Sequence, residues 1–262
     1  MPELLNKARI RRSFRRSLMT YDEQATVQKQ AGERLLDLLE SCPPVTVDRV
    51  LEIGCCTGIL SELFCRRFAP ATFFLNDLVD EFVKAVPARL SGAWQGHLQG
   101  LPGDIEQQML PRDLSLVISS STFQWLVDLP TLLTRLATAI RPGGQLAISL
   151  FGPGTLSEFK ALTGVGLRYR SLEAIRAILE QFFVIEVQES RDEQLFFDHP
   201  REVLHHLRAT GVGGVAEFQW NKGRLRRFEQ DYQTRFGTAA GVGVTYTTLF
   251  FIARRREGPG ER

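Results

Sequence analysis

The sequence has little of what marks several large protein classes. Its 262 residues include only four cysteines, none in a Cys-x-x-Cys pair, and no paired histidine motif accompanies them. This spacing argues against a disulfide framework or a zinc site. No apolar run approaches the roughly eighteen residues of a membrane helix, and none follows the basic N-terminus as in a signal peptide. We therefore expect a cytoplasmic protein with buried, reduced thiols, no metal and no membrane segment.

An excess of charge is also missing, because the formal net charge is only +2. The cations nevertheless gather at the ends: residues 1–16 hold six basic residues against one acidic residue, and residues 253–262 hold four against two. The body between them is acidic overall. This distribution disfavours a nucleic-acid-binding protein, which is usually basic over a whole face. With 44% hydrophobic and 24% charged residues, the composition is that of a globular chain.

Short apolar runs alternate with helical patterns along most of the chain. The runs lie at residues 49–53, 71–75, 94–98, 114–118, 145–150, 184–197 and 244–252. The helical patterns lie at residues 21–40, 59–68, 129–140, 171–182, 200–210 and 221–236, and Arg-Pro-Gly-Gly at 141–144 is expected to form a turn. Such alternation is typical of βαβ units. It predicts a single α/β domain with a doubly wound, mainly parallel, seven-stranded Rossmann-like sheet and a helical insertion before the last strand.

The strongest local signal is Leu-Glu-Ile-Gly-Cys-Cys-Thr-Gly at residues 51–58, which predicts a strand, a tight glycine loop and a helix start. Loop glycines let a ligand approach the backbone closely, and the helix start offers N–H donors. A dinucleotide fingerprint would need glycines at positions 56 and 59, where Cys56 and Ile59 stand. No Gly-Lys-Ser/Thr follows to cradle phosphates. The pattern therefore favours a nucleoside ligand without phosphates, such as S-adenosylmethionine.

Polar residues follow the neighbouring predicted strands in an order that supports this reading. Asp77 follows the second strand, where its carboxylate could accept both ribose hydroxyls. Asp104 and Ile105 follow the third, where they could offer adenine a hydrogen bond and an apolar shelf, and residues 119–121 are serines that end the fourth. Open α/β sheets bind ligands at this edge. Each residue also has a purely structural interpretation, as a helix cap or a turn residue.

These motifs carry a resemblance to a known superfamily. The chain resembles the class I S-adenosylmethionine-dependent methyltransferases over about residues 45–150 and at its last strand. The matching pieces are the 51–58 loop, Asn76-Asp77, Gly-Asp-Ile-Glu at 103–106 and the 141–144 segment. The superfamily usually has glycine where Cys56 stands, so the φ angle of Cys56 is expected to be negative or strained.

Within that superfamily the chain resembles the malonyl-acyl-carrier-protein O-methyltransferases over nearly its full length. The matching pieces are Ser13-Phe14, Tyr21-Asp22, and the segments at residues 123–125, 154–158 and 207–211. The resemblance implies transfer of a methyl group from S-adenosylmethionine to the free carboxylate of malonyl-acyl-carrier protein. The products would be S-adenosylhomocysteine and the methyl ester that starts pimelate assembly for biotin. Within a single domain we therefore expect an N-terminal lid and basic helix (1–44), a cofactor half (45–150) and a substrate half (151–262) with the insertion at about 200–243. We also expect a monomer.

By the same resemblance, individual residues acquire roles toward the cofactor. Gln28 and the 52–58 loop would face its methionine end, Asp77 its ribose, and residues 104 and 105 its adenine. The serines after the fourth strand would face its amino group, and Tyr21 would close over the site. The cofactor-binding candidates are Gln28, Glu52, Gly54, Cys55, Gly58, Asn76, Asp77, Asp104, Ile105, Ser119 and Ser120.

A carboxylate acceptor is already ionised near pH 7, so we expect no catalytic general base. A buried carboxylate still needs a cation, and Arg208 is the substrate-binding candidate beside Tyr21. The alternative is that Arg208 lies on the surface of a helix and has no contact with substrate. The pattern over residues 7–18 predicts a basic amphipathic helix. From the residues alone, such a helix could contact an acidic protein, RNA, a membrane surface or only solvent. The resemblance implies that its cations Lys7, Arg9, Arg12 and Arg16 dock the acidic carrier protein.

Two alternative functions stay open at this point. The first is O-methylation of a free small carboxylic acid. The second is a methyltransferase-like assembly protein without activity, an alternative that rests on Cys56. Methylation of RNA lacks support, because no Asn/Asp-Pro-Pro-aromatic motif follows the fourth predicted strand.

Overall fold

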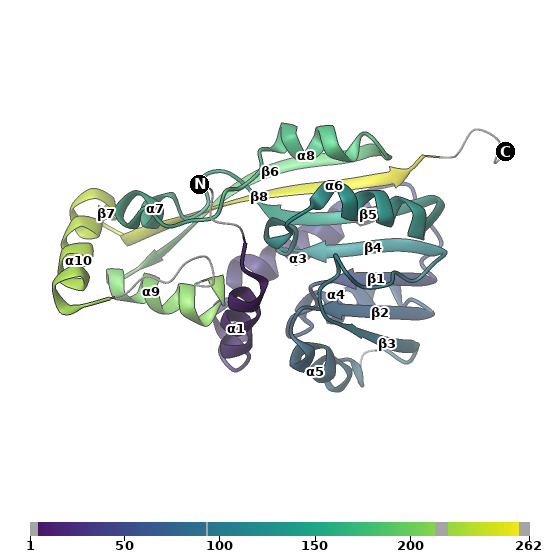
Figure 1. Cartoon of the computed structure of the whole chain (residues 1–262), viewed down its shortest axis with the longest axis horizontal. Coiled ribbons are helices and arrows are strands. Elements are labelled where there is room, and N and C mark those ends of the chain that lie inside the picture. The colour runs from purple at the N-terminus through teal and green to yellow at the C-terminus, as the bar shows by residue number, and fades with distance from the viewer. Residues whose placement is uncertain (1–4, 93, 213–219, 257–262) are drawn as a thin grey trace. The chain divides into compact units, whose positions relative to one another are not determined.

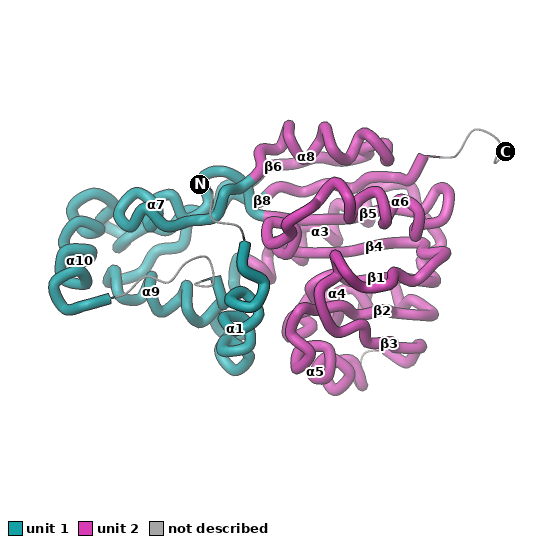
Figure 2. The backbone as a smooth tube through the Cα atoms, viewed as in Figure 1, with its two compact units in different colours: residues 1–27, 151–169, 191–248 teal, residues 28–150, 170–190, 249–262 magenta. Residues whose placement is uncertain are grey.

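The computed structural model of the chain describes residues 5–92, 94–212 and 220–256 (Figure 1). The chain divides into two compact units (Figure 2). Unit 1 comprises residues 1–27, 151–169 and 191–248, and unit 2 comprises residues 28–150, 170–190 and 249–262. Residues 213–219 of the predicted helical insertion lie outside the described residues. Within the described part of the chain, no helix is long and apolar enough to cross a membrane.

Within the described residues the sheet contains eight strands, in the order β3-β2-β1-β4-β5-β8-β6 with β7 paired to β8. The strands are β1 Arg49–Ile53, β2 Thr72–Asp77, β3 His97–Pro102, β4 Leu114–Ser120, β5 Ile140–Phe151, β6 Phe183–Phe197, β7 Gly237–Thr238 and β8 Gly241–Arg255. β1, β2, β3, β4 and β5 pair in parallel, whereas Figure 1 shows β8 running opposite to β5. The doubly wound, mainly parallel sheet is thus confirmed, and the two-residue β7 adds to the seven expected strands.

The helices fall into two sets according to unit. Unit 2 contains most of α3 Thr26–Glu40, together with α4 Ile59–Phe68, α5 Asp80–Leu90, α6 Leu129–Ala139, α8 Leu172–Leu179 and the short 3₁₀ helix η1 Phe123–Trp125. Unit 1 contains α1 Lys7–Ser17, α2 Tyr21–Gln24, α7 Ser157–Thr163, α9 Pro200–Ala209 and α10 Lys222–Phe236.

The central strands of unit 2 are buried on both faces. Leu51 and Val117 belong to one hydrophobic cluster, while their neighbours Val50 and Leu116 belong to a second. Successive strand residues point to opposite faces of the sheet, so each apolar run contributes side chains to both clusters. This double burial explains why the strands appear in the sequence as continuous apolar runs instead of alternating ones.

Three sequence-based boundaries are wrong. The helix expected over residues 21–40 is broken at Ala25, which leaves the helical region with φ −84° and ψ 44°. The third strand was expected to begin at Trp94 but begins at His97. Trp94 lies outside the strand, and its Nε1–H donates to the carbonyl of Pro70 at 2.8 Å. The turn expected at 141–144 lies within β5: Ile140 pairs with Leu114 and residue 145 pairs with residue 116, so the intervening segment bulges out of the register.

In unit 1, α9 packs against α1, α2 and α10. The predicted N-terminal helix is confirmed as α1, with Ile10 only 2% exposed and Phe14 half-buried. Gly211, just after α9, allows this contact, because a Cβ there would lie 2.6 Å from the Phe14 ring. The Thr20 hydroxyl donates to the Ala209 carbonyl at 3.1 Å and so ties the start of α2 to the end of α9.

Candidate cofactor-binding site

The glycine loop after β1 adopts a conformation that glycine favours at three positions. Gly54, Cys56 and Gly58 have φ angles of +79°, +46° and +87°. The N–H groups of Gly54 and Cys55 both donate to the carbonyl of Asn76 at the end of β2, at 2.8 and 2.9 Å. Cys56 therefore takes the strained alternative expected from the sequence, at a cost of roughly 1–2 kcal/mol for a residue with a Cβ.

Asp77 closes the same loop from the side of β2. Its Oδ2 accepts the N–H of Cys56 at 2.9 Å, and its Oδ1 accepts the N–H of Val79 at 2.8 Å. Asp77 as a whole is 8% exposed, and burial raises the pKa of its carboxyl group to about 6. Each oxygen keeps a second lone pair, so these structural bonds leave capacity for the two ribose hydroxyls of a nucleoside.

Glu52 is the most perturbed carboxyl group of the site. Its side chain is fully buried, and its Oε2 accepts the Ser61 hydroxyl at 2.6 Å. Burial raises the pKa of Glu52 to about 8, and the charge of Asp77 adds to this effect while the Ser61 hydrogen bond opposes it. Glu52 is therefore largely protonated near neutral pH as long as no cation lies beside it.

Five buried side-chain oxygen atoms of unit 2 have no hydrogen-bond partner among the described residues. One of them, Asp48 Oδ1, lies 3.0 Å from the guanidinium of Arg141 in an ion pair, and the other four belong to segments that carry cofactor-binding candidates. These four are Gln28 Oε1 on α3, Glu52 Oε1 on β1, Thr57 Oγ1 in the loop and Ser121 Oγ after β4. Buried polar atoms in native proteins are almost always hydrogen-bonded, so such atoms indicate the place of a polar ligand. Carboxyl and amide oxygens accept from an ammonium group, and hydroxyls can donate to a carboxylate. The residues present thus fit the amino-acid end of S-adenosylmethionine.

The segment after β4 lies directly against the glycine loop. Any Cβ at Gly54 would collide with the side chain of Thr122. Two of the serines predicted here are already occupied: Ser119 Oγ donates to the Ile53 carbonyl at 2.6 Å, and Ser149 Oγ donates to Ser120 Oγ at 2.8 Å. The orphaned hydroxyl belongs to Ser121, the next serine of the same run, which was not among the residues predicted to bind the cofactor.

Asn76 acts as a brace between two strands. Its Nδ2 donates to the carbonyls of Leu101 and Gly103 at 2.7 and 2.9 Å, while its own carbonyl holds the glycine loop. The side chain of Asn76, which was predicted to contact the cofactor, therefore donates its hydrogen bonds within the protein. It fixes the start of the loop that carries Asp104 and Ile105.

That loop, at residues 103–110, is clamped by two side chains that sequence reasoning missed. Arg135 on α6 donates to the carbonyls of Ile105, Glu106 and Gln108. The Glu106 carboxylate accepts the N–H groups of residues 127 and 128. Ile105 is only 4% exposed and belongs to the core, and Asp104 Oδ1 accepts the N–H of Glu106 at 3.2 Å.

The substrate candidates Tyr21 and Arg208 lie in unit 1 on two helices that contact each other, α2 and α9. Tyr21 is 8% exposed, and Arg208 is exposed. His206 is buried while its neighbour His205 is exposed, as adjacent helix positions should be. His206 Nε2 lies 2.8 Å from the Tyr246 hydroxyl, and burial lowers the histidine pKa to about 4. A neutral His206 cannot be the cation that holds a carboxylate.

The basic residues at the two ends of the chain differ in their surroundings. On α1, Lys7 and Arg9 are half-buried, and Arg12 and Arg16 are exposed. Near the C-terminus, the guanidinium groups donate inside unit 2: Arg254 to Glu186 and to the carbonyls of residues 143 and 43, Arg255 to that of residue 140, and Arg256 to that of residue 180. These three arginines therefore anchor β8. No group of three potential metal ligands occurs among the residues that the structure describes.

Comparison with known proteins agrees with this geometry. Residues 51–148 match a family described as a methyltransferase domain. A malonyl-[acyl-carrier protein] O-methyltransferase from Chlorobium phaeovibrioides is 37% identical over 98% of this chain and 100% of its own length. Its counterpart from Acinetobacter baylyi is 37% identical over 96% and 98%.

The N-methyltransferase NodS from Bradyrhizobium japonicum, solved with S-adenosyl-L-homocysteine, shares the fold with a TM-score of 0.61. It is 15% identical to this chain, and the match covers 95% of this chain and 99% of that protein. The sheet, the glycine loop and the full-length sequence matches lead to one conclusion: the chain belongs to the malonyl-[acyl-carrier protein] O-methyltransferase family of class I methyltransferases.

Proposed function

We propose that the protein transfers a methyl group from S-adenosylmethionine to the free carboxylate of malonyl-acyl-carrier protein. The proposed substrate rests on the full-length match to two proteins that are named for this activity. The cofactor is supported by the four orphaned oxygens on α3, β1, the glycine loop and the segment after β4. The resulting methyl ester would prime pimeloyl synthesis for biotin, as the resemblance implies.

The cofactor, when bound, supplies an electrophilic methyl group on a sulfonium. Glu52 and Gln28 would accept from its ammonium group, and Thr57 and Ser121 would donate to its carboxylate. Asp77, already fixed by two backbone N–H groups, would accept from the ribose. The loop held by Arg135 would line the adenine. An ammonium beside Glu52 would favour the ionised carboxylate and so return its pKa toward the ordinary range.

The acceptor needs no activation, because a malonyl carboxylate is ionised near pH 7. Catalysis then consists of aligning its oxygen with the methyl group and excluding water. Arg208 would hold the carboxylate through its guanidinium, and Tyr21 would cover the reacting groups. The contact between α2 and α9 supports a shared role for these two residues. The exposed cations of α1, including Arg12 and Arg16, would attract the acidic carrier.

A methyl-transfer assay tests this function directly. The purified protein is incubated with labelled S-adenosylmethionine and, in parallel, with malonyl-acyl-carrier protein, malonyl-coenzyme A or free malonate. The proposal expects the highest kcat/KM with the carrier-bound substrate and a labelled methyl ester that mild base removes. Preference for free malonate would instead support a small-acid methyltransferase. Absence of S-adenosylmethionine binding in isothermal titration would support a non-catalytic protein with a distorted loop at Cys56.

A further inference from the structure

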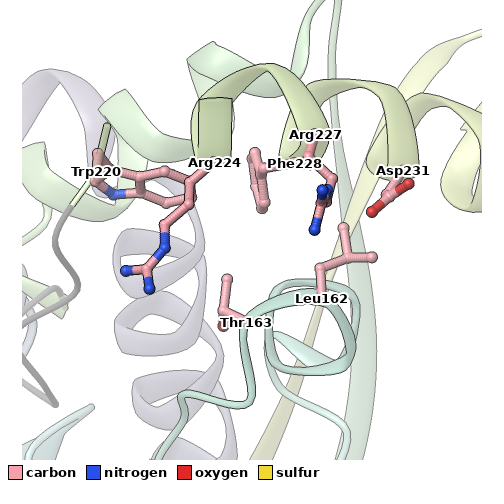
Figure 3. A pocket seen from close by; sticks show the side chains of 7 residues that line it. All are labelled: Leu162, Thr163, Trp220, Arg224, Arg227, Phe228 and Asp231. Carbon is pink, nitrogen blue, oxygen red and sulfur yellow. The ribbon is translucent and has the colours of Figure 1, made fainter. Parts of the chain in front are cut away.

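Unit 1 contains a pocket that the cofactor and substrate candidates do not use. It lies between α10 and the C-terminal end of α7 and has a volume of about 250 Å³ (Figure 3). Its lining residues are Leu162, Thr163, Trp220, Arg224, Arg227, Phe228 and Asp231. Small-molecule sites usually measure about 300–1,000 Å³. The pocket is therefore better matched to one or two protein side chains than to a cofactor.

The floor of this pocket is aromatic and well packed. Phe228 is 5% exposed, and its ring meets those of Trp220, Tyr232 and Phe159 edge-on, with centroids 5.1, 5.3 and 6.0 Å apart. Leu162 of α7 adds an aliphatic wall opposite α10 (Figure 3). A rigid apolar floor of this kind suits an inserted aliphatic or aromatic anchor.

The rim of the pocket is predominantly cationic. α10 contains five basic residues and two acidic ones, and the acidic Glu229 forms an ion pair with Arg201 of α9. Residues 224, 227 and 231 follow each other at helical spacing and share the face toward α7. Arg226 does not line the pocket, because its position is on the other side of the helix. The charged residues around the apolar floor are thus two arginines and one aspartate, which gives the rim a net positive charge.

We propose that α10 and this pocket dock an acidic helix of the carrier protein that brings the substrate. An apolar side chain of that helix would enter over Phe228, and carboxylates beside it would pair with Arg224 and Arg227. An apolar anchor within a charged rim is the usual arrangement of an interaction hot spot. This inference rests on the proposed function, because it presumes a carrier-bound substrate. It adds a second contact to α1, since α9 packs against both basic helices.

Three single substitutions on one helix test the docking. R227E replaces attraction by repulsion and should weaken binding of holo acyl carrier protein about tenfold, given the energies of exposed charge pairs. D231N removes the one acidic lining residue and should tighten binding about two- to threefold. R226E makes the same charge change as R227E away from the pocket and is the matched control, with less than a twofold effect expected. Circular dichroism and thermal melting verify that each variant folds.

Binding is measured by isothermal titration and by the fluorescence of Trp220, whose signal is identified by its loss in W220F. Equal weakening by R226E and R227E, or no weakening by R227E, overturns the docking site. The proposal is also overturned if a single-stranded RNA binds the wild-type protein as tightly as the carrier does and R227E weakens that binding. The surface would then be a general polyanion site. Methyl transfer is assayed separately. If the wild-type protein methylates malonyl-carrier while R227E binds normally, the docking fails and the function stands.

Discussion

Replacing Glu52 by glutamine should stabilise the protein while it weakens cofactor binding. Burial raises the pKa of Glu52 from about 4.5 in an unfolded chain to about 8. Between these values the folded state holds a proton that the unfolded state has lost, so stability falls as pH rises from about 4.5 to about 8. At pH 7 this penalty amounts to about 3 kcal/mol, at about 1.4 kcal/mol for each pH unit above 4.5.

Glutamine has nearly the same shape but cannot ionise, so it removes the penalty. Its carbonyl can still accept the Ser61 hydroxyl, while its amide N–H₂ would occupy the position of the orphaned Oε1 at a cost of about 1 kcal/mol. We expect E52Q without cofactor to gain about 2 kcal/mol in the free energy of unfolding at pH 7 and little at pH 5. Loss of a charge-assisted hydrogen bond to the ammonium should weaken S-adenosylmethionine binding roughly 10- to 100-fold.

Urea unfolding at pH 5, 6, 7 and 8 measures the first effect, and isothermal titration measures the second. The difference between variant and wild type isolates Glu52 from Asp77, whose raised pKa contributes to both curves. E62Q on α4 is the control of opposite sign, because ion pairing with Arg89 lowers the Glu62 pKa and makes its charge stabilising above that pKa. Parallel pH profiles for E52Q and wild type would refute a neutral buried Glu52, and unchanged cofactor affinity would refute its contact with the ammonium.

Three further substitutions test the loop, the clamp and the basic helix. C56G should raise the free energy of unfolding by about 0.5–1 kcal/mol in urea melts, because relief of the positive φ outweighs the greater conformational entropy that glycine gives the unfolded chain. A lower free energy of unfolding would mean that packing of the Cys56 side chain stabilises the loop. R135A should weaken S-adenosylmethionine binding about tenfold in isothermal titration, with R135K in between, because three loop carbonyls lose their donor; lost stability at unchanged affinity would contradict a positioning role. R12E/R16E should raise KM for malonyl-carrier several-fold in the methyl-transfer assay without altering cofactor affinity, and an unchanged KM would remove α1 from the docking surface.

Local patterns in the sequence were enough to predict most of the sheet. Runs such as residues 114–118 are apolar on both faces, and only a strand buried between two helical layers needs that composition. The 51–58 loop was also recognisable, because its glycines follow a strand directly. α5 was not expected: its apolar residues are interrupted by Pro87, which the helix nevertheless contains.

Features that depend on distant neighbours were out of reach. Whether Ser119, Ser120 or Ser121 carries the orphaned hydroxyl depends on acceptors such as the Ile53 carbonyl, 66 residues away in the chain. The 141–144 segment contains turn residues, but its bulge within β5 is set by pairing with β4. Arg135 has no local signature, because its three acceptors are backbone carbonyls of another loop. The roles of Tyr21 and Arg208 toward substrate stay predictions.

The arginines near the two ends of the chain should respond differently to ionic strength. Exposed cations such as Arg12 and Arg16 act on a partner through water, and at about 0.1 M salt this attraction is screened beyond roughly 10 Å. Arg254 instead contacts Glu186 at 2.6 Å and the Gly143 carbonyl at 2.9 Å, and both side chains of this ion pair are partly buried, so salt screens it much less. Added salt should therefore slow the encounter with an acidic partner while β8 stays anchored, so that recognition is more sensitive to salt than the attachment of this strand.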